Sequence, residues 1–177
     1  MLAYLFVILA VAVRFMPHPW TFTPVIGSLL FFGARGSRKQ MWLPLLMLAV
    51  TDVILTKAVY AYAFTWDHYV TWLWYGAILW LGTQLRKNAS PLRVIAAALG
   101  SSVSFYLLSN LAAWAAYTDM YPRSLNGIMM SYVAGLPFFR HAMEGDLLFT
   151  CAMFGTPVLL TYLSNLLHKP SNNHISA

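Results

Sequence analysis

Four apolar segments of this chain are long enough to cross a lipid bilayer, and they restrict what it can fold into. They lie at about 41–60, 69–85, 91–117 and 146–167. A membrane-spanning helix needs about 20 apolar residues. The composition agrees, because 60% of the 177 residues are hydrophobic and only 9% are charged, too few to cover a soluble domain. We expect one membrane domain over 1–167 and a polar cytoplasmic tail over 168–177.

Two shorter apolar segments, 2–16 and 24–34, complete a predicted all-α bundle of about six transmembrane helices. Each is shorter than a normal span, so the pair either crosses a thinned bilayer or forms an incomplete hairpin. Thr23 and Pro24 suit the cap and the first position of the second helix. The first segment is similar to the apolar part of a signal peptide. Because Arg14 follows it and no basic residue precedes it, we interpret it as a retained helix.

The distribution of Lys and Arg predicts the orientation. The connections 34–40 and 86–93 and the tail are basic and contain no Asp or Glu, whereas Asp67 and Asp119 lie in connections at the other side. The positive-inside rule therefore places both termini in the cytoplasm, as expected for a multi-pass protein of the inner (plasma) membrane. This pattern explains the net charge of +6 without nucleic-acid binding; the predicted surroundings are the lipid bilayer.

The connections on the outer side are long and distinctive. The first, 14–23, holds two prolines and should be stiff. The last, 117–145, has apolar residues on one helical face, which predicts an amphipathic outer helix between the last two spans, ended by Pro137. This face consists of Leu125, Ile128, Met129, Tyr132, Val133 and Leu136. We expect the segments 14–23 and 124–137 to pack together over the outer end of the bundle.

Asp52 stands inside an apolar segment, where a carboxylate costs about 2.5–3.5 kcal/mol on insertion scales. Such a residue needs a cation or hydrogen-bond donors. We expect Arg14 as its first partner, because a guanidinium can bind a carboxylate through two nitrogens, and His18 as its second. A structural ion pair and a ligand or proton contact both explain Asp52 at this point.

The segment 91–117 carries polar and aromatic residues at four-residue spacing, which places them on one helical face. They are Ser102, Tyr106, Asn110 and Trp114. Such a face points toward other helices or a cavity, so helix packing and ligand binding both remain open. The sequence contains no metal-binding, nucleophile-elbow, P-loop or dinucleotide motif, so no enzyme activity, metal or cofactor is predicted.

Several motifs carry a family resemblance: RFMPHPWTFTPVIG, LAVTDVIL, SNLAAW and YPRSLNGIMMSYVAGLPFFRHAMEGDLLFT. They resemble an uncharacterised bacterial membrane family described as transport proteins, which is similar to the substrate-binding S components of energy-coupling factor (ECF) transporters. That resemblance implies six helices, a vitamin-like ligand bound from outside, and a membrane scaffold with two ATPases as partners. The stretch WDHYVTWLWYGAILWLG is similar to solitary cobalamin S components, although Asp67, His68 and Tyr69 stand where those carry a cobalt-ligating cysteine.

The sequence therefore predicts a transport protein of S-component type that takes up a small micronutrient, with a corrinoid among the candidates. The expected pocket or gate residues are Arg14, His18, Phe22, Asp52, His68, Asn110, Trp114, Tyr121, Arg123, Tyr132, Arg140 and Asp146. The alternatives are an accessory subunit of a membrane complex and a small membrane enzyme using Asp52, His68 or His141. An enclosed cavity would favour a transporter, and a filled core would favour a subunit.

Overall fold

The computed structural model describes residues 1–16 and 22–167, and all regular secondary structure in these ranges is helical. The predicted all-α fold is confirmed for this part of the chain. His18 and the tail 168–177 lie outside it. The α-helices are α1 (Leu2–Val13), α2 (Val25–Arg35), α3 (Trp42–Ile54), α4 (Asp67–Gln84), α5 (Pro91–Ala116) and α6 (Leu125–Leu167). A 3-10 turn, η1 (Arg38–Gln40), precedes α3, and a π-helical turn, η2 (Leu55–Val59), follows it.

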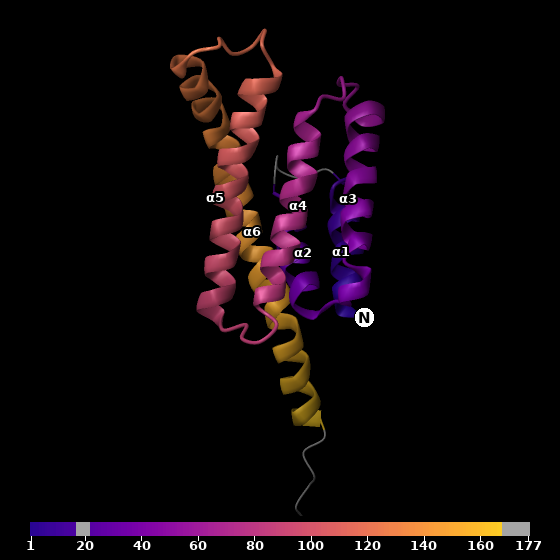
Figure 1. Cartoon of the computed structure of the whole chain (residues 1–177). Helices are drawn as coiled ribbons and strands as arrows, with labels where there is room; N and C mark the ends of the chain where they lie inside the picture. Colours follow the sequence, from indigo (N-terminus) through magenta and orange to yellow (C-terminus); the bar gives the residue numbers. More distant parts are fainter. Residues whose placement is uncertain (17–21, 168–177) are drawn as a thin grey trace, which may run out of the picture.

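The helices form two groups that meet at α2 and α4 (Figure 1). One group is the long antiparallel hairpin of α5 and α6, and the other contains α1 and α3. The α2 helix is central, because every residue from Val25 to Ala34 is buried. It approaches α4 very closely at Gly33, where a Cβ atom would meet the backbone of Leu79 and Gly82. Glycine at this position therefore sets the α2–α4 distance.

Three helical stretches are long and apolar enough to cross a membrane: Arg38–Val59, Pro91–Ala116 and Leu125–Leu167. The helices α1 and α2 contain 12 and 11 residues, which correspond to lengths of roughly 18 and 17 Å at 1.5 Å per residue. The hydrocarbon core of a bilayer is about 30 Å thick. The two helices are therefore a short hairpin, and six complete spans stay a prediction.

The ends of the bundle differ in charge. Figure 1 places Met1, the connection between α4 and α5, and the final turn of α6 toward the same end. The connections after η2 and after α5 lie at the opposite end. The basic residues Arg38 and Lys87 thus share one end with the N-terminus, which agrees with the predicted sorting of charge; the side that each end faces stays a prediction.

The prediction of a separate amphipathic helix ended by Pro137 was wrong. Pro137 lies inside α6, which continues for 43 residues from Leu125 to Leu167. Proline removes one backbone hydrogen bond, but membrane helices tolerate this loss when neighbours satisfy the freed groups. Pro137 leaves the Val133 carbonyl without its helical donor, and one turn away α5 contacts the same helix, since the Tyr106 hydroxyl donates to the Tyr132 carbonyl at 2.7 Å.

The orientation of this part of α6 explains the error. Its buried residues are small, namely Gly127, Ser131 and Gly135. Gly135 lies against Asn110 of α5, and Gly127 lies against Pro122 of the preceding connection. The predicted apolar face is turned outward instead: Leu125, Met129, Val133 and Leu136 are all exposed. Small residues allow two membrane helices to approach closely, while lipid accepts the apolar side chains.

The start of α2 also differs from the expectation. The cap residue is Pro24, no side chain caps the helix, and the first helical residue is Val25. Thr23 is therefore not a capping residue. Gly36 follows the last residue of α2.

Candidate functional site

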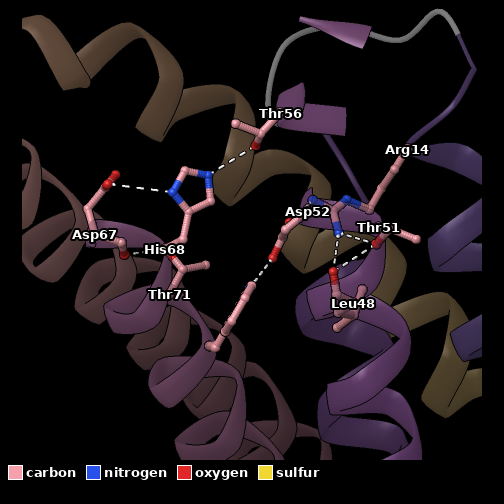
Figure 2. A network of polar contacts seen from close by, with 9 residues as sticks. Arg14, Leu48, Thr51, Asp52, Thr56, Asp67, His68 and Thr71 are labelled. Carbon is pink, nitrogen blue, oxygen red and sulfur yellow. Dashed lines mark hydrogen bonds and ion pairs between the residues drawn. The ribbon is translucent and has the colours of Figure 1, made fainter. Parts of the chain in front are cut away.

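An ion pair between Arg14 and Asp52 lies in the interior of the bundle (Figure 2). Arg14 directly follows α1, and Asp52 belongs to α3. The Arg14 Nη2 atom pairs with Oδ1 of Asp52, while Nη1 donates to Thr51 Oγ1 at 2.8 Å and to the Leu48 carbonyl at 3.4 Å. The side chains of Arg14 and Asp52 are 14% and 9% exposed. The predicted partner of Asp52 is confirmed.

The expected two-nitrogen contact between Arg14 and Asp52 is not formed. The second carboxylate oxygen of Asp52 accepts a hydrogen bond from Trp72 Nε1 at 2.8 Å instead. The Tyr75 side chain, one turn later on α4, also interacts with Asp52. The carboxylate thus joins α1, α3 and α4, and its charge is compensated by Arg14.

A central cavity of about 140 Å³ lies beside this ion pair. Residues of four helices and of the connection between α1 and α2 line it: Arg14, Thr23, Val25, Ile26, Trp74, Tyr75, Phe105, Ala142 and Asp146. The short α1–α2 hairpin is the reason that Arg14 and Thr23 reach this depth. Most of the lining is apolar or aromatic, and the charged groups are Arg14 and Asp146.

A side cavity of about 240 Å³ lies between α5 and α6. It shares Phe105 and Ala142 with the central cavity, so the two spaces are neighbours. Its polar lining comes from the α5 residues Ser102, Tyr106, Ser109 and Asn110. Three of the four residues of the predicted α5 stripe therefore face this cavity. Asn110 donates to the Tyr106 carbonyl at 2.8 Å and lies against Gly135 of α6.

Asp146 is a second buried carboxylate, and it lies at the junction of the cavities. The residue is 4% exposed, and its Oδ2 atom accepts a hydrogen bond from Ser102 Oγ at 2.7 Å. The side chains of Asp146 and Arg14 line the same cavity without forming an ion pair. Thr150, one turn further along α6, has a buried hydroxyl without a hydrogen-bond partner in the described part of the chain.

His68 takes part in a separate network at the start of α4 (Figure 2). Its Nε2 atom lies 3.0 Å from Thr56 Oγ1, its Nδ1 atom lies 3.1 Å from the Thr65 carbonyl, and its ring stacks on Phe64. These contacts fasten the η2 turn to α4, and His68 lines neither cavity. Within residues 1–16 and 22–167, no group of three or more His, Cys, Asp or Glu side chains is arranged to hold a metal ion.

Other predicted site residues lie away from the two cavities, near the end of α5. Arg123 donates to the carbonyls of Trp114 and Ala115 at 3.2 and 2.7 Å, and so caps the C-terminus of α5. The Trp114 indole donates to the Pro122 carbonyl at 3.0 Å. Tyr132 donates to the Leu107 carbonyl at 3.0 Å. These residues join α5 to α6, and half-buried Tyr121 lies in the same connection.

Two further predicted residues belong to the surroundings of the site. Phe22 packs against Gly145 and the ring of Phe149, with ring centroids 5.4 Å apart. The described end of the loop 14–23 thus contacts α6 beyond the segment 124–137. Arg140 is 79% exposed, pairs with Glu144, and is not part of either cavity.

Trp72, Trp74, Tyr75 and Phe105 were not predicted as site residues. The tryptophans of this region, namely Trp66, Trp72, Trp74 and Trp80, form a sequence pattern that is typical of an interfacial aromatic belt. Trp72 and Tyr75 share one face of α4, and a carboxylate at the depth of Asp52 needs donors. Combining these two facts would have identified both residues from the sequence.

The fold and the site define an all-helical protein with an apolar core that contains a few buried polar side chains. Among its described residues, three helices are capable of crossing a membrane. The chain belongs to the DUF6580 family, a family of unknown function, whose model matches residues 1–167. No curated protein and no solved structure matches the chain.

Proposed function

We propose that this chain is a plasma-membrane transport protein of S-component type, with about six spans and both termini in the cytoplasm. It binds a small micronutrient from the outside and takes it up. The central cavity is the main support, because it combines a buried charge at Asp146, the Arg14 guanidinium and aromatic walls. Ligand pockets typically combine apolar walls with a few convergent polar groups.

The volumes restrict the ligand. Sites for drug-sized molecules measure about 300–1,000 Å³, whereas the central and side cavities measure about 140 and 240 Å³. A small solute matches these dimensions. A corrinoid is far larger than either cavity and would require the helices to separate.

The chain carries no nucleotide-binding motif, so uptake depends on a concentration gradient or on a partner. The family resemblance makes an ECF scaffold with its ATPases the proposed partner. Arg14 and Asp52 serve here as a tie between the α1–α2 hairpin and α3, and they keep the Arg14 wall of the cavity in place.

Mass spectrometry of gently purified full-length protein tests this proposal, with variants of α6. Ala142 lines both cavities, so Ala142→Phe should fill their shared wall. Ala134 is exposed on the same helix, so Ala134→Phe adds the same group outside the cavities. We expect a small molecule to co-purify with the wild type and with Ala134→Phe, but not with Ala142→Phe. Equal recovery from all three proteins, or none from any, would contradict the proposal.

The C-terminal part of α6 favours an accessory subunit as a second candidate. It extends beyond the other helices (Figure 1), and its apolar side chains are exposed. They are Val158, Leu159, Leu160, Tyr162, Leu163, Leu166 and Leu167. Cross-linking through cysteines placed at 159 and 163 in intact membranes would identify a protein that covers this part of α6; a subunit requires one defined product.

A further inference from the structure

The charges around the central cavity do not balance. Among the described residues that line the central and side cavities, Arg14 is the only base and Asp146 the only acid. Arg14 is already paired with Asp52, outside the lining, and its two terminal nitrogens are directed at α3. When all three groups are ionised, they leave one net negative charge, at Asp146.

The surroundings of Asp146 do not compensate this charge. Ser102 is its one hydrogen-bond donor within residues 1–16 and 22–167, and a hydroxyl supplies a dipole without a charge. A buried carboxylate without a counter-ion is strongly unfavourable in an apolar medium. The cavity therefore requires a positive group beside Asp146 when this residue is ionised.

The walls of the cavity indicate which positive group fits. Trp74, Tyr75 and Phe105 line it together, with ring centroids 4.6 Å apart for Trp74 and Phe105 and 5.9 Å apart for Trp74 and Tyr75. Trp74 and Tyr75 are 5% and 6% exposed. Aromatic faces attract ammonium groups, and this attraction is strongest where water is excluded. An inorganic cation would need several oxygen ligands instead.

We propose that the central cavity binds a small organic ammonium ion, with Asp146 as its counter-ion and the rings of Trp74, Tyr75 and Phe105 as its walls. This inference rests on the proposed function and names its substrate class: a protonated amine or a quaternary ammonium compound. The apolar body of the substrate extends past Phe105 and Ala142 into the side cavity, where Asn110 and Ser109 supply polar contacts.

Three probes with the same tert-butyl body test the charge: tert-butylammonium, tert-butanol and pivalate. Thermal unfolding of the purified full-length protein is followed at neutral pH by tryptophan fluorescence. We expect tert-butylammonium to raise Tm steadily with the logarithm of its concentration, by roughly 5–10 °C at a hundredfold excess over its Kd. The alcohol and the carboxylate should leave Tm unchanged. Sodium chloride, added at the same concentrations, tests whether an inorganic cation has the same effect.

Two variants of α6 locate the effect. Asp146→Asn should weaken the response to tert-butylammonium at least tenfold. Glu144→Gln removes the same charge two residues away, where the side chain is 49% exposed, and should respond like the wild type. If Asp146→Asn does not fold, the wild-type probe series decides by itself.

The remaining outcomes separate this inference from the proposed function. A response to pivalate or tert-butanol, with none to the ammonium ion, overturns the inference and leaves a small-molecule site in place. A rise in Tm with sodium chloride that is as large as the rise with tert-butylammonium would replace the organic ligand with an inorganic one. No response to any probe also overturns the inference, and the Ala142→Phe experiment then judges the transport function separately.

Discussion

The Trp72 indole nitrogen of α4 lies 2.8 Å from Oδ2 of Asp52, the carboxylate oxygen that the Arg14 ion pair leaves free. One carboxylate therefore holds the end of α1 and the middle of α4 against α3. Few residues of α3 are buried: Pro44, Leu48, Thr51 and Asp52. Polar contacts thus supply much of the attachment of α3, in contrast to the apolar packing around α2.

This arrangement predicts a strong coupling between Arg14 and Asp52. Asp52→Asn should reduce the free energy of unfolding by about 3–5 kcal/mol, because it leaves a buried guanidinium without its counter-ion. Combining Arg14→Gln with Asp52→Asn removes both charges and should recover at least half of the loss. Chemical unfolding in detergent micelles measures these differences.

The exposed pair of Arg140 and Glu144 is the matched control for this cycle. Their side chains are 79% and 49% exposed, and they lie one turn apart on α6. Such pairs contribute about 0.3–0.5 kcal/mol, so Glu144→Gln should hardly change stability. If Asp52→Asn left folding intact and abolished only ligand uptake, Asp52 would have the functional role that the sequence also allowed.

The close contact of α2 with α4 predicts different responses at two glycines. Gly33→Ala places a methyl group against the backbone of Leu79 and Gly82, so we expect a loss of about 1–3 kcal/mol from overpacking. A Cβ atom at Gly76 of α4 meets nothing within 4 Å. Gly76→Ala should therefore be neutral or stabilising by up to about 1 kcal/mol. Equal effects at both positions would contradict the close approach.

The predictable part of this structure followed from electrostatics and helix length. A carboxylate inside an apolar segment needs a partner, and Arg14 stands at the end of the first helix, at a depth similar to that of Asp52. The ion pair of these two residues was therefore predictable. The four-residue spacing on α5 similarly found the residues that line the side cavity. Each inference needs only the position of a residue along its own helix and the cost of leaving a polar group without a partner.

The features that were not predictable depend on whether an apolar helix face packs against protein or contacts lipid. Spacing alone cannot tell whether Val133 contacts α5 or lipid, because an alkyl side chain is stable in both. Pro137 similarly does not end α6, which continues to Leu167, because membrane helices tolerate proline in their interior. The aromatic residues Trp72 and Trp74 face inward although the sequence pattern was typical of an interfacial belt.

The orientation can be tested with single cysteines. Cys151 is exposed, so it is first replaced by alanine. A cysteine at Ser37 or Asn88 lies in a basic connection and should react with an impermeant maleimide only after the membrane is opened. A cysteine at Asp119 should react in intact cells. The opposite pattern would reverse the predicted orientation. If all three sites reacted from the same side, α5 would not cross the membrane between Asn88 and Asp119.

The last prediction concerns the face that α6 turns toward α5. Ser131 is 1% exposed and lies between Gly127 and Gly135 on the buried face, whereas Val133 is 63% exposed. Ser131→Leu adds bulk where two helices touch and should lower the free energy of unfolding by about 1–3 kcal/mol. Val133→Leu enlarges an outward side chain and should change it by less than about 0.5 kcal/mol. In an amphipathic lid over the bundle the two positions would be reversed, with Val133 packed inside and Ser131 in water. The substitution that lowers the free energy of unfolding more therefore identifies the face of α6 that packs on the protein.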